Sequence, residues 1–155
     1  MASQNEVKKI LDSLSGEEAI MAIDEVLTDL FYESPEALTQ AEMNIALVIE
    51  FEKEIENGGF NQFFFNTIGG YSFDILRALK EMSSKKTREL LNKAINQFPN
   101  SLVPKDHGER QELMEEIEDE ADEEWDLLDE AFYEYDEDLY VIMIEYIKKN
   151  INDFR

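Results

Sequence analysis

Carboxylates dominate one stretch of the sequence, MEEIEDEADEEWDLLDEAFYEYDED, which runs from Met114 to Asp138. Of its 25 residues, 15 are Asp or Glu, and none is Lys, Arg or His. Such a run has three interpretations: an amphipathic helix with a solvated face, a site for divalent cations, or a surface that a basic partner binds.

Calcium is the first ligand to test, because acidic loops are its usual binding sites. An EF-hand loop needs Gly at its sixth position, and the segments that begin at Asp122 and Asp136 both lack it. The chain has no Cys, one His and no Glu-x-x-His pair of the kind found in di-iron bundles. We therefore expect no metal site and no cofactor, with loose binding of divalent cations at high concentration left open.

Signals for catalysis are sparse. His107 lies in the polar connection PKDHGER, where a surface loop histidine is the simpler interpretation, and nothing marks a nucleophile. The glycine pairs form neither a dinucleotide-binding fingerprint nor a P-loop. We expect no catalytic residues and a protein that is not an enzyme, and an uncharacterised enzyme is kept as a third alternative.

Net charge restricts the ligands of this chain. Its 155 residues carry a formal charge of -23, which repels nucleic acid and anionic lipid, so we expect basic partners and neither direct nucleic acid nor membrane binding. Residues 10–52 contain 11 acids and no base, and residues 109–138 contain 17 acids and one base, Arg110. The N-terminal stretch lacks the apolar segment of a signal peptide, and no apolar run could span a bilayer. We expect a cytoplasmic protein.

Helical periodicity characterises the elements that must position these carboxylates. It predicts helices at about 7–14, 15–31, 39–56, 73–82, 85–98 and 139–150, with a helical turn at 60–66 and the acidic segment as another helix. Ser15 and Glu18 match a capping box, and Asn57-Gly58-Gly59 is typical of a helix end. The sequence therefore predicts one all-α domain over residues 1–155, a bundle of about seven or eight helices.

The acidic segment itself has apolar residues at helical spacing, including Met114, Ala121 and Leu128, as expected for a solvated amphipathic helix. Six cations of the near-neutral middle region could neutralise part of it: Arg77, Lys80, Lys85, Lys86, Arg88 and Lys93. Yet the segment holds nine i,i+4 carboxylate pairs and no pair of opposite charge. In a continuous helix each like pair costs roughly 0.2–0.5 kcal/mol. Its charge density, about one per 2.5 Å of helix, approaches the one per roughly 1.7 Å of duplex DNA.

The stretch EIENGGFNQFFFNTIGG (54–70), followed by LRALKEM and LLNKAINQFP, resembles the DNA-mimic protein family (domain of unknown function 4375). The resemblance covers about residues 40–147, including LLDEAFYEYDEDLYVIMIEYI. Its pattern is carried by these residues: Asn57, Gly58, Gly59, Phe60, Gln62, Phe63, Phe64, Asn66, Ala94, Phe98 and Pro99. The resemblance implies an all-α fold without known catalysis. As in a characterised bacterial member, it also implies a negative surface that occupies the DNA-binding face of a helix-turn-helix transcription factor.

We interpret the N-G-G-F motif as structural rather than as a ligand site. Its glycines turn the chain and its phenylalanines fill the core. The side chains of Asn57, Gln62 and Asn66 are expected to satisfy exposed backbone ends.

Together these observations predict a non-enzymatic bacterial protein that binds a basic DNA-binding regulator, expected to be of the helix-turn-helix type, and blocks its access to DNA. The carboxylates predicted to contact this partner are Glu115, Glu116, Asp119, Glu120, Asp122, Glu123, Glu124, Asp126, Asp129, Glu130, Glu134, Asp136, Glu137 and Asp138. The acidic block of residues 10–52 would extend this surface. The alternative is an acidic adaptor or immunity-type module unrelated to DNA. The oligomeric state is open, with a homodimer as one option.

Overall fold

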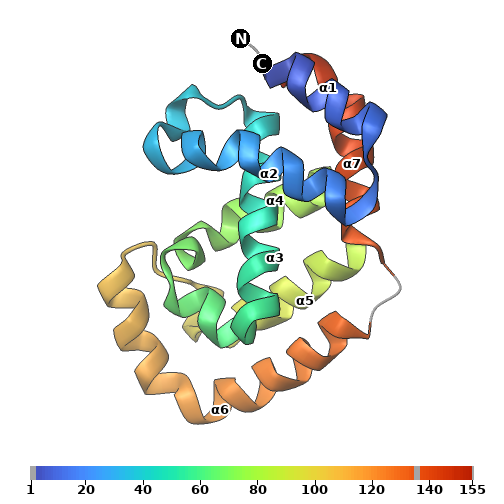
Figure 1. Ribbon diagram of the computed structural model, residues 1–155. Helices are drawn as coiled ribbons and strands as arrows, with labels where there is room; N and C mark the ends of the chain where they lie inside the picture. Colours follow the sequence, from blue (N-terminus) through green and yellow to red (C-terminus); the bar gives the residue numbers. More distant parts are fainter. Residues whose placement is uncertain (1–2, 135–136, 155) are drawn as a thin grey trace. The chain divides into compact units, whose positions relative to one another are not determined.

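The computed structural model describes residues 3–134 and 137–154. Those residues form seven α-helices and four short 3-10 helices and contain no strand, which confirms the predicted all-α class (Figure 1). The α-helices are α1 (Ser3–Ser13), α2 (Gly16–Glu33), α3 (Gln40–Phe65), α4 (Ser72–Glu81), α5 (Lys85–Ile95), α6 (His107–Tyr133) and α7 (Leu139–Lys149). The 3-10 helices are Pro35–Ala37, Thr67–Tyr71, Pro99–Ser101 and Ile151–Asp153.

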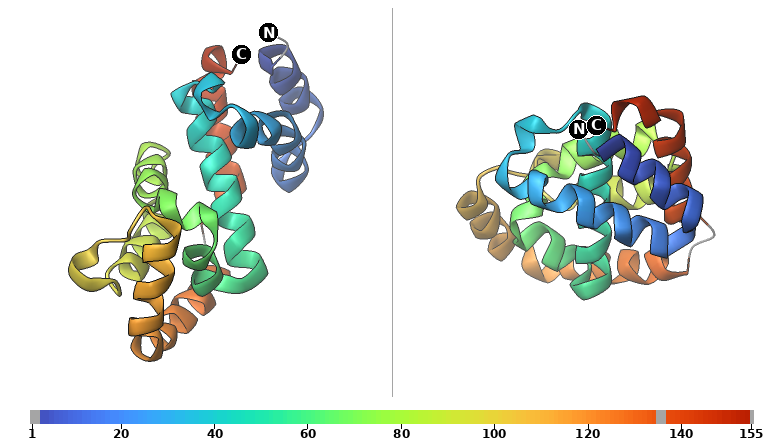
Figure 2. Two further views of the ribbon diagram at one scale, coloured as in Figure 1. Left: turned by 90° about the vertical axis from the view of Figure 1, so that its left-hand side faces the viewer. Right: turned by 45° about the horizontal axis from the view of Figure 1, so that its top comes forward.

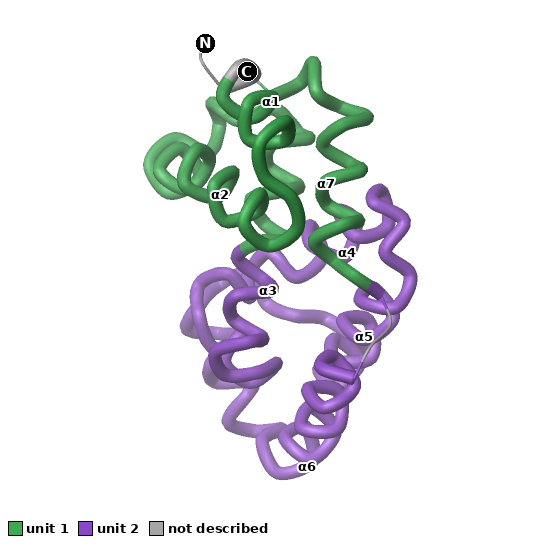
Figure 3. The backbone as a smooth tube through the Cα atoms, turned by 45° about the vertical axis from the view of Figure 1, so that its right-hand side comes forward, with its two compact units in different colours: residues 1–49, 138–155 green, residues 50–137 purple. Residues whose placement is uncertain are grey.

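The chain gathers into two compact helical units (Figure 3). Unit 1 comprises residues 1–49 and 138–155 and contains α1, α2, the start of α3, and α7. Unit 2 comprises residues 50–137 and contains the rest of α3 with α4, α5 and α6. The expectation of one domain over residues 1–155, with a family-like core at about 40–147, stays a prediction.

Unit 1 packs α2 against both α1 and α7 (Figure 2). Its core includes the fully buried side chains of Val7, Ile23 and Met143, one from each of these three helices. One buried polar group, Asn44 of α3, donates from Nδ2 to the Tyr146 hydroxyl of α7 at 2.9 Å. This hydrogen bond supplies a partner for an amide that would otherwise be buried at a large cost.

A capping box does occur in unit 1, but at a different helix from the predicted one. The Thr39 N–H donates to Glu42 Oε1 at 2.8 Å, and the Glu42 N–H donates to Thr39 Oγ1 at 3.1 Å, at the start of α3. The predicted box was wrong: α2 begins after Ser15, yet the Ser15 side chain makes no capping hydrogen bond. Gly16 adopts a φ of 57°, which turns the chain away from the geometry that brings a cap to the first-turn amides.

The predicted helix end in unit 2 is a kink inside α3. Gly59 adopts φ 76° and ψ -170°, a backbone conformation essentially restricted to glycine. After the kink, the fully buried rings of Phe60, Phe63 and Phe64 enter the core. The Phe64 ring lies 5.1 Å from that of Trp125 in α6, measured between centroids. The kink thus places three aromatic rings in the core, and one of them, Phe64, contacts the helix that carries the acidic run.

The polar residues around the kink have other partners than predicted. Gln62 and Asn66 both donate from their amides to the Glu54 carboxylate, at 3.1 Å and 2.9 Å, instead of to exposed backbone ends. Asn57 is exposed. The kink leaves the Phe60 backbone N–H without a helical partner, and this N–H donates a hydrogen bond to a carboxylate of α6.

Candidate functional site

Most of the acidic run lies in α6, a continuous helix of 27 residues that curves along its length (Figure 1). Its inner face carries the buried side chains of Met114, Ala121, Trp125 and Leu128. The Trp125 indole Nε1 donates to the Ala94 carbonyl of α5 at 3.1 Å, so even its polar group is satisfied in the core. With the apolar stripe packed inward, the other faces of the helix carry the carboxylates.

Arg110, the one base of the acidic block, fixes the first turn of α6 to the end of α3. It is fully buried, and its guanidinium donates to the carbonyls of Phe64 at 2.6 Å, Asn66 at 2.8 Å, Pro104 at 3.1 Å and Lys105 at 3.2 Å. Burial lowers the pKa of Arg110, while Asp106 opposes that shift; an arginine nevertheless stays protonated in proteins. The side chain therefore caps carbonyls at the end of α3 and does not neutralise the acidic run.

His107 is exposed, as predicted, but it is the first residue of α6 rather than part of a loop. Its Nδ1 accepts from Arg110 Nη2 at 3.2 Å, and its Nε2 lies 2.8 Å from the Gln111 side-chain nitrogen. Asp106, whose side chain accepts from the Glu109 N–H at 2.9 Å, caps the helix, so α6 begins at His107, upstream of the acidic segment that was predicted as a helix. The histidine belongs to this polar cluster at the helix start.

An outer acidic surface covers the exposed side of α6. We define it as the nine exposed carboxylates Glu112, Glu115, Glu116, Glu118, Asp119, Glu120, Glu123, Asp126 and Glu130. Among residues 3–134 and 137–154, no Lys or Arg forms an ion pair with any of them. Two of the cations expected to neutralise this face instead pair within their own helices, Arg77 with Asp74 at 3.1 Å and Lys93 with Glu89 at 3.6 Å. An acid three or four residues away in the same helix lies closer to each of these cations than the carboxylates of α6 do.

The charge density of this surface resembles that of one DNA strand. From Glu112 to Glu130 the helix rises about 27 Å, so exposed carboxylates occur about once per 3 Å of helix. Phosphates along one strand of duplex DNA occur once per roughly 3.4 Å. The average density of negative charge along α6 is therefore close to that along one DNA strand.

Asp129 and Tyr133, near the end of α6, bind the two sides of the α3 kink. Asp129 Oδ1 accepts from the Phe60 N–H at 2.8 Å, and the Tyr133 hydroxyl donates to the Ile55 and Glu56 carbonyls at 3.0 Å and 3.2 Å. Burial raises the pKa of the Asp129 carboxyl, although the Phe60 hydrogen bond opposes the shift. Burial also raises the pKa of Tyr133, and the Asp129 charge adds to it. Both side chains serve backbone groups that the kink leaves without helical partners.

Two further acidic residues cap helices. Glu137 Oε1 accepts from the Ser84 hydroxyl at 2.7 Å and from the Thr87 N–H at 3.2 Å, at the start of α5. Asp138 Oδ1 accepts from the N–H groups of Tyr140 and Val141, at 3.0 Å and 3.2 Å, at the start of α7. A carboxylate at a helix N-terminus satisfies free N–H groups and interacts favourably with the helix dipole.

The predicted partner-contacting residues therefore differ in exposure. Those that are exposed are Glu115, Glu116, Asp119, Glu120, Glu123, Asp126, Glu130, Glu134 and Asp138, and those that are half-buried are Asp122, Glu124, Asp129 and Glu137. Asp136 lies outside the described residues. The prediction omitted three exposed carboxylates of α6, Glu109, Glu112 and Glu118. The helical period, followed upstream as far as the Asp106 cap, would have included Glu109 and Glu112.

The described residues provide neither a metal-binding cluster nor a membrane-spanning helix. Within the described ranges, no group of three or more His, Asp or Glu side chains is placed to hold a metal ion. Over the same ranges, every helix is too short or too polar to cross a bilayer.

Comparisons with known proteins identify the family. A search of curated proteins and a search of solved structures each found no match. The model of the family described as DMP19-like protein matches residues 36–150, which cover α3 to α7 and include the whole of α6. This confirms the DNA-mimic family that the N-G-G-F motif indicates: the chain belongs to the DMP19-like protein family, which points to DNA mimicry in general.

Proposed function

We propose that the outer acidic surface of α6 is bound, in place of DNA, by a basic DNA-binding regulator of the helix-turn-helix type. Binding would occupy the DNA-reading face of the regulator and block its access to promoters. The protein would act without catalysis, in the bacterial cytoplasm, where such regulators meet DNA. Because most of the acidic block of residues 10–52 lies in unit 1, the proposal rests on α6 alone.

The observation that carries the proposal is the surface of nine exposed carboxylates, which averages about one carboxylate per 3 Å of helix. A basic surface that normally contacts phosphates would find acceptors at nearly the same average density. The negative potential of such a surface also attracts a basic partner over distance, so association should be fast and weakened by salt.

The like-charge repulsion in α6 favours this function over a merely solvated face. The helix contains eight i,i+4 carboxylate pairs, each costing roughly 0.2–0.5 kcal/mol in an exposed helix. The summed cost of these pairs, on the order of 2–4 kcal/mol, is a large fraction of the free energy of unfolding of an ordinary domain. A surface that only needs solubility can mix both signs of charge and avoid that cost. A surface that substitutes for phosphates must carry negative charge alone and cannot avoid that repulsion.

The experiment is a pull-down on the immobilised full chain from nuclease-treated lysate of the native host. Elution with duplex DNA should release a helix-turn-helix regulator. The triple variant Glu116→Gln/Glu120→Gln/Glu123→Gln should capture much less of it. If duplex DNA releases no DNA-binding protein, the acidic adaptor becomes the better interpretation and DNA mimicry is rejected.

A matched control separates the α6 surface from net charge. The variant Glu17→Gln/Glu18→Gln/Glu25→Gln removes the same three charges from exposed positions of α2. It should capture the regulator nearly as well as the unmodified chain. Equal losses in both triple variants would show that total charge, and not α6, determines binding.

A further inference from the structure

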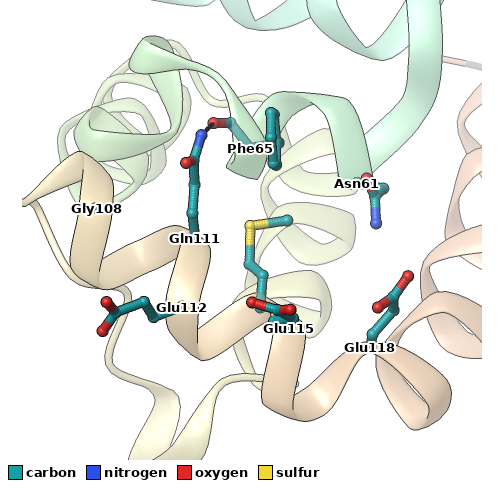
Figure 4. Close-up of a pocket in the computed structure, with 8 residues that line it drawn as sticks. Asn61, Phe65, Gly108, Gln111, Glu112, Glu115 and Glu118 are labelled. Carbon is teal, nitrogen blue, oxygen red and sulfur yellow. Dashed lines mark hydrogen bonds between the residues drawn. The ribbon is translucent and has the colours of Figure 1, made fainter.

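A groove beside the first half of α6 shares three carboxylates with the outer acidic surface and adds apolar side chains to them. It has a volume of about 490 Å³ and lies between the end of α3 and α6, within unit 2 (Figure 4). Phe65 and Met114 give it apolar surface, and Glu112, Glu115 and Glu118 give it carboxylates. The groove thus combines an aromatic ring with acceptors for a cation.

Phe65 is the exception in its FFF run. Phe63 and Phe64 are fully buried, whereas 50% of the Phe65 surface is exposed. The groove around it is held in place: Gln111 donates to the Phe65 carbonyl at 3.0 Å, and Asn61 donates to Asp122 at 2.7 Å. The Phe65 ring therefore presents an exposed aromatic surface to the groove.

The side chains that surround the ring come from both helices. In Figure 4, Glu118 reaches from α6 toward Asn61 on α3, with the Phe65 ring beside them, while Glu112 points away at the edge. A side chain bound in the groove would therefore lie among the Phe65 ring and the carboxylates of Glu115 and Glu118.

We propose that this groove receives an arginine side chain of the basic partner. The inference rests on the proposed function for the source of the arginine. An arginine offers methylene groups for the apolar surface, a planar cation that stacks on an aromatic ring, and a fork of donors for two carboxylates. A lysine offers a point charge without the fork or the stacking plane, and an acidic or neutral side chain would leave the carboxylates uncompensated.

The test titrates the 15N-labelled full chain with the peptide acetyl-Gly-Arg-Gly-amide, followed by NMR. The side-chain amides of Asn61 and Gln111 should shift, and the backbone amides around Glu130 should not. The same peptide with citrulline, which keeps the shape and removes the charge, should produce no saturable shift. The lysine peptide should bind at least twofold more weakly. Equal binding by lysine or citrulline, or shifts spread evenly along α6, would overturn the assignment.

Variants locate the contact. Phe65→Ala should weaken the arginine peptide about two- to fivefold, the factor that a cation–π contact provides. Glu118→Gln should weaken it too, whereas two controls on α6 outside the groove, Leu127→Ala and Glu130→Gln, should not. Phe65→Leu keeps most of the apolar volume and so controls for loss of folding. Because it lacks an aromatic face, it should bind the arginine peptide as weakly as Phe65→Ala. Unchanged affinity in both Phe65 variants contradicts the proposal.

The titration contains no regulator and no DNA, so it fails independently of the proposed function. If the peptide binds in the groove while duplex DNA releases no partner from the full chain, DNA mimicry is wrong and the arginine site stands. If DNA releases a regulator while the peptide does not bind, the arginine site is wrong and the mimicry stands.

Discussion

Two regions of the acidic run share a composition and differ in what their carboxylates do. In residues 115–126 most carboxylates are exposed, and Asp122 alone accepts a hydrogen bond from another side chain of the described chain, Asn61. Among the described residues between 129 and 138, three carboxylates accept backbone N–H groups: Asp129 at the α3 kink, Glu137 at α5 and Asp138 at α7. The first region faces solvent, and the second holds helix ends together.

The difference teaches that the role of a carboxylate depends on the backbone it meets. Helix ends and kinks leave N–H groups without partners, and a nearby carboxylate is a strong acceptor for them. Where the acidic run passes such an end, its carboxylates become structural. Where it passes only solvent, they remain available to a partner.

The largest expected effect comes from the kink that Asp129 serves. Gly59→Ala would place a Cβ atom 2.1 Å from Asp129 Oδ2, at a backbone conformation that alanine rarely adopts. We expect a loss of about 2–4 kcal/mol in the free energy of unfolding, measured by urea denaturation. The control Gly108→Ala, whose Cβ would have its nearest neighbour at 3.5 Å, should lose nothing. Equal stability of the two variants would contradict the structure of the kink.

Removing the Asp129 acceptor should have the next largest effect. Asp129→Ala leaves the Phe60 N–H without its partner and should cost about 1–3 kcal/mol. Asp129→Asn keeps an acceptor oxygen and should cost less, measured in the same urea series. If Asn is as costly as Ala, the charge of Asp129, and not its hydrogen bond, stabilises the kink.

A comparison of the wild type with Asp129→Asn tests the direction of the Asp129 pKa shift. Because burial raises this pKa in the folded state, the folded chain binds the proton more tightly than the unfolded chain. Relative to Asp129→Asn, the wild type should therefore gain stability as the pH falls through the raised pKa. The gain should stop below the ordinary pKa of about 3.9 in the unfolded chain. A gain with rising pH would show that the hydrogen bond outweighs burial.

Glu137 should have a smaller effect, because it caps a helix that other contacts also hold. Glu137→Ala removes the acceptor for Ser84 and Thr87 and should cost about 0.5–2 kcal/mol. Hydrogen exchange should become faster at the Thr87 amide and at the Lys86 amide, which donates to Glu137 Oε2 at 3.4 Å. The control Glu134→Ala removes an exposed carboxylate and should change neither. Unchanged exchange in Glu137→Ala would contradict its role as a cap.

Local patterns in the sequence predict the helices and the glycine interruption, but they do not predict which acid meets which backbone end. Hydrophobic spacing gives the inner face of α6 correctly, because it depends on the helical period alone. Asp126 and Asp129 look alike in the sequence and differ because only Asp129 faces the kink, 69 residues away. Arg110 likewise binds carbonyls 44 and 46 residues away, a contact with no local signal. The Thr39 and Glu42 box is local, and the sequence could have revealed it.

The smallest effect on folding, with the opposite sign, is expected in the exposed region. The triple variant Glu116→Gln/Glu120→Gln/Glu123→Gln removes four i,i+4 carboxylate pairs of α6. Each removed pair should stabilise the helix by about 0.2–0.5 kcal/mol at low salt and by less when salt screens the charges. We expect a gain of about 1 kcal/mol or less in urea denaturation at low ionic strength, which fades at high ionic strength.

The α2 variant Glu17→Gln/Glu18→Gln/Glu25→Gln removes the same net charge but only one i,i+4 carboxylate pair, Glu25 with Asp29. It should therefore gain less stability than the α6 variant. If the two triple variants gain equal stability, the reduction in net charge explains the effect, and the i,i+4 carboxylate pairs of α6 contribute no additional repulsion. A loss of stability in the α6 variant would mean that its exposed carboxylates are structural like Asp129 and Glu137. The difference between the two regions would then disappear.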